Sequence, residues 1–338
     1  MASAPCGQTN AGTAPVRPRV LAVIPAKEDS VWMIFARRQV NAIARTGLDI
    51  RMFYLSSRTS PRILFKEFLR FRRELREYRP DLVHAHFGSV NAFFCALATR
   101  TPLIITFWGS DLNPVPTAVS SLHWRFTHLL SQLAALAATD VICASSQLRS
   151  RLWLRRDARI VPTGVDPQEF CPSPRLEARH RLGWEQDVPV VLFNASNKPE
   201  FKGLPVVREA IEYVRQTMPR VRLEVMEGNV SPEKAPLYFA AADCLVLASL
   251  FEGSPTVVQE ALACNLPVVS VDVGDVRERL WGVSPSRIVE RNPAAIGRGI
   301  AEVLACGTRS NGRENLGDCA VDRIAQRVRT VYENVYSH

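Results

Sequence analysis

Short apolar runs rich in β-branched residues recur along this 338-residue chain, and each is separated from the next by a segment long enough for a helix. The first run, residues 20–25, is apolar throughout, as expected of a strand buried on both faces of a parallel sheet. Parallel neighbours need crossover connections, which the intervening segments can supply. The alternation therefore predicts a doubly wound α/β fold. The other strand-like runs of the first half are 49–55, 82–86, 103–107, 141–144 and 160–166.

Prolines at 167, 172 and 174 interrupt this alternation, which restarts at residue 188. Proline-rich segments between such units are typical of linkers. We therefore predict two Rossmann-like domains that face each other across a cleft, with ligands near the carboxyl ends of the strands. The predicted parts are a flexible leader at 1–18, an N-terminal domain at 19–165, a linker at 166–185, a C-terminal domain at 186–315 and a C-terminal helix at 316–338. This helix either stays with the C-terminal domain or crosses back to the N-terminal domain.

Charge is unevenly distributed between the two halves of the chain. Lys and Arg number 42 against 33 Asp and Glu, which gives a net charge of +9. Residues 1–165 hold 22 basic and 10 acidic residues, a balance of +12, whereas residues 166–338 hold 20 and 23, a balance of −3. A basic surplus favours acidic partners such as nucleic acid, anionic lipid head groups or phosphorylated ligands.

The sequence contains no apolar run that approaches the roughly 18 residues of a membrane span. Residues 1–18 lack the apolar centre of a secretory signal. The eight cysteines form no C-x-x-C pair, and several lie in apolar runs, which favours reduced, buried thiols over disulfides or zinc. These features predict a cytoplasmic protein.

Residues 240–263 carry the most informative chemistry. The pattern predicts a strand that ends near residue 247, a turn through 252–255, and a helix that begins at 255 or 256 with Ser254 as its candidate cap. Free amides at a helix start bind phosphate, and Gly253 permits close approach of a ligand. Glu252 and Glu260 flank this start, where carboxylates accept hydrogen bonds from sugar hydroxyls. Taken alone, the two glutamates also fit a charge that complements the helix dipole and a solvated surface residue.

The ordered set of features resembles the donor site of retaining glycosyltransferase family 4. Glu-x7-Glu brackets Gly-Ser-Pro, follows Ala-Ala-Asp and an apolar strand, and precedes the segment 265–274; the likeness runs from about Val20 to about Arg291. The resemblance implies the B-type glycosyltransferase (GT-B) fold, with an acceptor-binding N-terminal domain and a nucleotide-sugar-binding C-terminal domain. It also implies that Glu252 lies beside the donor sugar and that Glu260 binds the ribose hydroxyls.

The same resemblance assigns a cation to the donor diphosphate. Lys202, followed by glycine, matches the family's lysine, and a fixed ammonium stabilises the charge that develops on the leaving group. The family's Gly-Arg is replaced by residues 194–201, where Lys198 is a point charge that lacks bidentate geometry. The catalytic candidates are Glu252 and Lys202. The donor-binding candidates are Glu260, Gly253, Ser254, Pro255, Thr256, Val257, Lys198 and Asn194.

Two family elements of the N-terminal domain are altered. Trp108 stands where relatives often carry a histidine that touches the transferred sugar, so a histidine-dependent step does not carry over. The family's Gly-Gly is absent after residue 25. The bulkier, charged loop there indicates a specialised acceptor pocket with Lys27 and Arg37 as candidate contacts, and an ordinary strand-to-helix connection is the alternative. His84 and His86 share a strand face and also fit a two-ligand metal pair, for which no third ligand is evident. The acceptor-side candidates are Trp108, Gly109, Asp111, His86 and Lys27.

Residues 62–79 form a predicted amphipathic helix with seven basic and three acidic residues. Its apolar stripe, at positions 64, 68, 71, 75 and 78, is expected to pack on the first sheet and to leave the basic face free. A second basic cluster, at 149, 151, 155, 156 and 159, surrounds Trp153. Because each basic residue near an anionic membrane contributes about 1 kcal/mol, we hypothesise peripheral attachment to the inner membrane leaflet.

The combined interpretation is a retaining, metal-independent enzyme of the hexosyltransferase type. It would move a sugar from a nucleoside-diphosphate donor to a saccharide or lipid-linked saccharide in cell-surface polysaccharide or glycoconjugate synthesis, without a cofactor. The alternatives are a sugar-nucleotide epimerase of the same fold class and a non-catalytic sugar-nucleotide-binding partner of another glycosyltransferase. Nucleic-acid binding rests on charge alone and has no recognised motif, so no nucleic-acid partner is expected.

Overall fold

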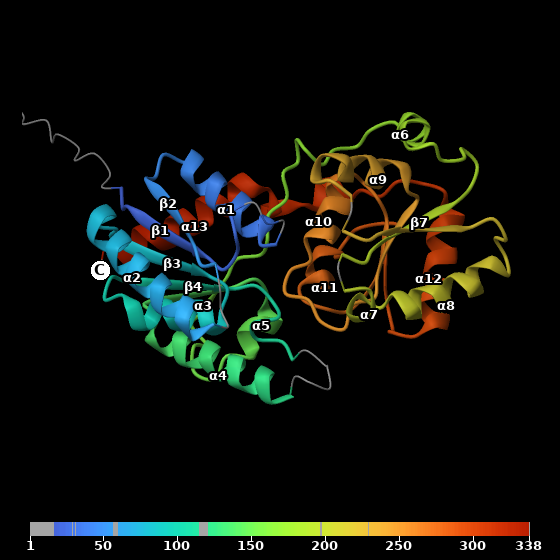
Figure 1. Ribbon diagram of the computed structural model, residues 1–338. Helices are drawn as coiled ribbons and strands as arrows, with labels where there is room; N and C mark the ends of the chain where they lie inside the picture. The colour runs from blue at the N-terminus through green and yellow to red at the C-terminus, as the bar shows by residue number, and fades with distance from the viewer. Residues whose placement is uncertain are drawn as a thin grey trace, which may run out of the picture.

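The computed structural model describes residues 17–28, 30, 32–56, 60–114, 121–196, 198–228 and 230–337, which form two domains side by side (Figure 1). The strand pairs in both sheets are parallel, which confirms the doubly wound α/β prediction. The predicted leader lies, up to residue 16, outside the described residues.

The N-terminal domain is built on a six-stranded sheet whose central strands are buried along their whole length. One face of this sheet packs against α1 (Ile34–Arg45) and the last helix, α13 (Val321–Tyr336). The opposite face packs against α2 (Pro61–Tyr78), α3 (Ser89–Ala98) and α4 (Ser121–Ala137). In sheet order the strands are β2 (Ile50–Tyr54), β1 (Val20–Ile24), β3 (Leu82–His86), β4 (Leu103–Phe107), β5 (Asp140–Cys143) and β6 (Arg159–Ile160), and the short α5 (Ser146–Ser150) follows β5.

The C-terminal domain has a five-stranded sheet with helices on both sides (Figure 1). Its strands, in sheet order, are β11 (Arg287–Val289), β10 (Val268–Val271), β9 (Cys244–Leu247), β7 (Val190–Asn194) and β8 (Arg222–Met226). Its helices are α7 (Pro199–Lys202), α8 (Leu204–Arg215), α9 (Ala235–Ala241), α10 (Thr256–Ala263), α11 (Val276–Arg279) and α12 (Pro293–Cys306).

The segment predicted as a linker, 166–185, contains a helix of its own, α6 (Arg175–Leu182), which packs against α9. Arg179 on this helix is fully buried, and its guanidinium pairs with Asp243 at 2.6 Å and donates to the Ala241 carbonyl at 3.0 Å. A buried cation needs such partners, so α6 is fixed to the C-terminal domain. The linker prediction is therefore too long at its carboxyl end.

Two segments that cross between the domains lie beside each other. Val165 pairs in parallel with Ala320, and a Cβ on Gly164 would lie 2.9 Å from the Cα of Val321. The chain then continues into α13, which packs along α1. The C-terminal helix thus crosses back and becomes part of the N-terminal domain.

The described cysteines are free thiols, and five of these seven are buried. Burial raises the pKa of Cys264 to about 12 and that of Cys319 to about 11, so both thiols are protonated at neutral pH. Within the described ranges, none of the helices combines the length and apolar character that crossing a membrane requires.

Candidate active site

The two predicted catalytic residues are in direct contact. Lys202 ends α7, Glu252 lies in the loop between β9 and α10, and the Lys202 Nζ to Glu252 Oε1 distance is 2.6 Å. Both side chains are largely buried, which strengthens the attraction relative to an exposed pair. Gly203 makes this contact possible, because a Cβ there would lie 2.4 Å from the Ala248 carbonyl oxygen. The glycine after the lysine is thus required by the close approach of the two loops.

Glu260 lies on α10 and lines a cavity of about 160 Å³ between the domains, the smaller of two cavities described here. Across this cavity, Arg38 of α1 pairs with Glu169 at 2.8 Å. Burial raises the pKa of Glu260 to about 7, although the positive charge of Arg38 opposes the shift. A carboxyl group with this pKa changes charge near neutral pH. Thr256, at the first turn of the same helix, lines the cavity as well.

Ser254 does not cap α10 as predicted, since Pro255 is the residue before the helix and makes no side-chain cap. The Ser254 hydroxyl instead donates to Asp275 at 2.9 Å and lies 3.2 Å from the Thr163 amide of the N-terminal domain. Gln259 also donates to this hydroxyl, at 3.0 Å. Because its hydrogen bonds are made within the protein, the Ser254 side chain ties the domains together and is not a free ligand donor.

The backbone of Gly253 contacts the N-terminal domain. A Cβ at this position would lie 1.8 Å from the carbonyl oxygen of Trp108, and a Cβ on Gly109 would lie 3.4 Å from the Gly253 amide nitrogen. Asn113 extends the contact by donating its amide to the Glu252 carbonyl at 3.0 Å. We expected Gly253 to admit a ligand; the group that approaches it here is the opposite domain's backbone.

The predicted acceptor-side residues at the end of β3 and after β4 are buried. Asp111 accepts the backbone N–H groups of Gly88, Trp108 and Gly109 at 2.7–3.2 Å, so its carboxylate organises the loops at these strand ends. His86 is fully buried and stacks on the Trp108 ring, and burial lowers the pKa of His86 to about 3. A neutral, enclosed imidazole cannot exchange protons with a substrate in the cleft. The acceptor predictions for His86 and Trp108 therefore lack the required access.

The structure also shows what His84, one of the two histidines considered as metal ligands, contacts. The His84 ring nitrogens lie 2.6 Å from the Tyr332 hydroxyl and 2.7 Å from the Thr106 hydroxyl, so both are in hydrogen bonds. Counting only the residues that the structure describes, no group of three or more His, Cys, Asp or Glu side chains is arranged to hold a metal ion. His84 is a buried link between β3 and α13.

The remaining predicted side chains divide into occupied and exposed groups. Arg37 donates to the backbone carbonyls of Lys27, Glu28 and Ser30, and so holds the loop after β1 in place. Asn194 accepts the Ser196 amide at 3.0 Å and caps the turn after β7. The side chains of Lys27 and Lys198 are exposed. Only the last two are free to meet a ligand.

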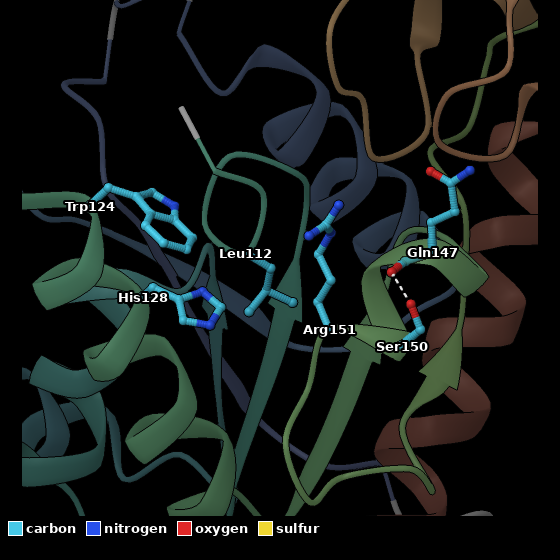
Figure 2. A pocket seen from close by; sticks show the side chains of 6 residues that line it. All are labelled: Leu112, Trp124, His128, Gln147, Ser150 and Arg151. Carbon is cyan, nitrogen blue, oxygen red and sulfur yellow. Dashed lines mark hydrogen bonds between the residues drawn. The ribbon is translucent and has the colours of Figure 1, made fainter. Parts of the chain in front are cut away.

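An open cavity of about 500 Å³ lies in the N-terminal domain between α4 and α5 (Figure 2). Trp124 and His128 stand on one side with their rings stacked at 4.9 Å, and Arg151 points in from the other side. Burial and the charge of Arg151 lower the pKa of His128, which favours the neutral imidazole. The lining residues are Leu112, Trp124, His128, Gln147, Ser150 and Arg151.

This cavity adjoins the contact between the domains. Gln147, which lines it, accepts the amide of Gly274 at 2.9 Å, and the Trp124 indole donates to the Asn113 carbonyl at 2.9 Å. Sequence reasoning missed the cavity, because its lining combines residues of α4 and α5 with Leu112, after β4, and Arg151, after α5. The available signal was the pair Trp124 and His128, which lie one turn apart on one face of α4.

Arg291 is a second residue that sequence reasoning missed. It follows β11, and its Nε donates to the Ala248 carbonyl at 2.9 Å, the same oxygen that Gly203 approaches. A guanidinium therefore lies next to the segment that carries Lys202. Arg291 is nearly 100 residues from β7, after which the family's arginine is expected, so spacing alone does not indicate it.

Comparison with known proteins agrees with this arrangement. Residues 25–169 match the family model described as Glycosyltransferase Family 4, and residues 225–306 match the model for Glycosyl transferases group 1. The fold and both matches define a two-domain GT-B protein. The chain belongs to the group 1 glycosyltransferases, of the family 4 type.

The chain matches individual relatives over only part of their length. The chain is 29% identical to a putative teichuronic acid biosynthesis glycosyltransferase, TuaC, of Bacillus subtilis over 60% of this chain and 55% of the relative. It is 30% identical to a D-inositol 3-phosphate glycosyltransferase of Geodermatophilus obscurus over 69% of this chain and 62% of the relative, so it spans less than two thirds of both. The structure of Anabaena Alr3699/HepE in complex with UDP-glucose superimposes with a TM-score of 0.70 at 15% identity, covering 94% of this chain and all of the other.

Proposed function

We propose that the protein is a retaining glycosyltransferase that moves a hexose or related sugar from a nucleoside-diphosphate donor to a saccharide or lipid-linked saccharide. The observation that carries this proposal is the 2.6 Å contact between Lys202 and Glu252 at the start of α10, in a chain of the group 1 family. The pair holds a cation and a carboxylate beside a helix start that attracts phosphate.

In the proposed reaction, Lys202 turns from Glu252 to the donor diphosphate and stabilises the negative charge of the leaving nucleotide. Glu252 then accepts hydrogen bonds from the donor sugar, while Glu260 binds the ribose hydroxyls from the smaller cavity. Departure of the diphosphate on the same face as the attacking hydroxyl retains the anomeric configuration. The complex of the related fold with UDP-glucose supports a sugar nucleotide as donor.

Arg291 is proposed to compensate for the family arginine that is missing after β7. Its guanidinium is held at the Ala248 carbonyl, next to Gly203, and so places a second permanent positive charge beside Lys202. Two fixed cations offset the charge of a leaving diphosphate without a divalent metal, and no cofactor is required. Activity that persists unchanged in excess EDTA is the expected result; abolition by EDTA contradicts metal independence.

The acceptor is proposed to bind in the cavity between α4 and α5. The stacked rings of Trp124 and His128 suit the apolar face of a sugar ring, and Arg151 suits a carboxylate or phosphate on the acceptor. The part of the chain that the structure describes contains no carboxylate within ion-pair distance of Arg151, so this charge is available. An anionic saccharide or a saccharide on a lipid phosphate has this chemistry.

Such an acceptor is consistent with cell-surface polysaccharide or glycoconjugate synthesis. The name of the TuaC relative assigns that protein to teichuronic acid biosynthesis. We propose a role of the same general kind for this chain. We propose a cytoplasmic protein that attaches peripherally to the inner membrane leaflet through basic residues of the N-terminal domain. On α2 the apolar residues Phe71 and Tyr78 are buried as predicted, which leaves the basic side chains outward.

The deciding experiment incubates the protein with a panel of nucleotide sugars and anionic saccharide acceptors, and detects products by mass spectrometry. We expect transfer from one donor class, and loss of donor hydrolysis and transfer in Glu252→Gln and Glu260→Gln. Glu209→Gln, an exposed carboxylate on α8, is the matched control and is expected to be as active as the unchanged protein. Undiminished turnover in both active-site variants contradicts the proposal, and donor binding without turnover favours the non-catalytic binding partner.

A further inference from the structure

Helix α4 presents an apolar stripe to solvent. Five large apolar side chains, spaced alternately four and three residues apart, are between 40% and 79% exposed. This spacing places them on one face of a helix. The opposite side of α4 packs on the sheet and lines the cavity with Trp124 and His128. The residues of the stripe are Leu122, Phe126, Leu129, Leu133 and Leu136.

The α4 stripe is part of a larger apolar surface. Trp153 and Leu154 are more than half exposed, and Trp153 contacts the α4 residue His128 through its ring. Helices α2 and α3, which lie on the same sheet face as α4, add further exposed apolar residues. Eleven of the sixteen exposed large apolar side chains in the described chain belong to α2, α3, α4 or residues 153–154. Soluble monomers seldom concentrate exposed apolar residues in this way.

The charges around the stripe are positive. Within its residues, α4 carries one basic side chain, Arg125, and no carboxylate. The neighbouring segment 147–159 carries five arginines and a single acid, Asp157, which pairs with Arg155. An apolar stripe with a basic border is complementary to an anionic lipid surface. A second copy of this chain would meet the same basic border in a symmetric contact and be repelled by it.

We infer that the α4 stripe, with Trp153 and Leu154, inserts into the interface of an anionic phospholipid bilayer. This inference rests on the proposed membrane attachment and specifies its chemistry: α2 attracts the membrane by charge, whereas α4 binds it by burial of apolar surface. Insertion of α4 would hold the cavity, which lies on the other side of the same helix, close to the lipid head groups. A lipid-linked acceptor would then reach Trp124 and Arg151 without leaving the leaflet.

The test is flotation with vesicles of phosphatidylglycerol and phosphatidylcholine, at low and at high salt. The stripe variant combines Leu122→Gln, Phe126→Gln and Leu133→Gln, which keep helix propensity and change only exposed positions. The control variant combines Leu176→Gln, Tyr213→Gln and Trp281→Gln, three exposed apolar residues of the C-terminal domain. Because the stripe variant replaces three apolar side chains of the inserted surface, we expect at least about a tenfold loss of partitioning in this variant, persisting at high salt, and none in the control.

A stripe variant that floats like the unchanged protein overturns the inference while leaving charge-based attachment intact. If neither the unchanged protein nor the stripe variant floats, both the stripe inference and charge-based attachment are overturned. Transfer to a water-soluble acceptor then still tests the glycosyltransferase proposal separately. Light scattering that shows a dimer of the unchanged protein and a monomer of the stripe variant, with equal flotation, assigns the stripe to a second copy and also overturns the inference. Circular dichroism checks the fold, and Leu129→Gln with Leu136→Gln repeats the test independently.

Discussion

The two domains present different kinds of side chain where they meet. In the C-terminal domain, Lys202 and Glu252 contact each other and keep 22% and 13% of their side chains exposed. In the N-terminal domain, His86 and Trp108 occupy strand ends but are enclosed. The accessible rings come from α4, and the accessible guanidinium is that of Arg151, just after α5. Charged groups of the first set keep contact with solvent because their desolvation is costly, whereas the aromatic residues of the second set pack into the core. The proposed donor side thus follows a sequence motif, and the proposed acceptor side does not.

Replacing Lys202 tests the donor side most directly. Lys202→Ala removes the ammonium that contacts Glu252 and is proposed to stabilise the leaving diphosphate, so we expect kcat to fall about 10³-fold. Lys234→Ala is the matched control, because Lys234 is an exposed lysine of the same domain to which no role is assigned. Steady-state kinetics with saturating donor measures both. Equal losses in the two variants would mean that the contact with Glu252 has no special role.

Gly253→Ala tests whether the domains must meet at the loop between β9 and α10, which carries Glu252 and Gly253. A methyl group would lie 1.8 Å from the Trp108 carbonyl oxygen, so the loop or the opposite domain must shift. A displacement near 1 Å costs about 10²-fold in rate, and we expect a loss of that order with donor binding retained. Gly109→Ala, whose Cβ would lie 3.4 Å from Gly253, is expected to have a much smaller effect. Similar rates for both variants would show that this contact is absent during catalysis.

Much of the fold was predictable from the sequence, because both sheets consist of parallel strands with apolar runs such as β1 and β4. The family resemblance also assigned Lys202 and Glu252 to one donor site, although it did not predict their direct contact. The helix α6 was missed because its charged sequence has little apolar periodicity and packs instead through buried Arg179. Ser254 was misassigned because its partners, Thr163 and Asp275, are distant in sequence.

The acceptor side illustrates a different difficulty. Histidine and tryptophan at a strand end are equally compatible with an open cleft and a closed core, and only the packing of neighbouring rings decides between them. Here Phe35 contacts Trp108 edge to face, and Trp108 stacks on His86. The cavity residues could not be grouped from the sequence, since α4 and α5 approach one another only through the fold.

Substitutions in the cavity should separate the acceptor site proposed there from the one predicted at His86 and Trp108. We expect Trp124→Leu and Arg151→Gln each to raise KM for the acceptor about tenfold, because each removes one favourable contact, while KM for the donor stays unchanged. Arg125→Gln, which changes an exposed arginine of the same helix, is the control. His86→Phe should leave acceptor KM unaltered, since His86 is enclosed. A rise in acceptor KM for His86→Phe alone would restore the original prediction.

The pKa of Glu260 predicts the smallest effect, a dependence of donor binding on pH. Burial raises this pKa from 4.5 to about 7, so the carboxyl group is mostly protonated at pH 6 and mostly ionised at pH 8. The ionised form accepts hydrogen bonds from ribose hydroxyls, so affinity for UDP should rise up to about tenfold between these values. The free energy of unfolding should change in the opposite direction. The folded state holds a proton that the unfolded state releases between pH 4.5 and 7, so stability falls as pH rises through this window. Calorimetric titration at both pH values measures the affinity, and Glu260→Gln should abolish its pH dependence while Glu209→Gln preserves it. A pH dependence that survives in Glu260→Gln would assign the titration to a group other than Glu260.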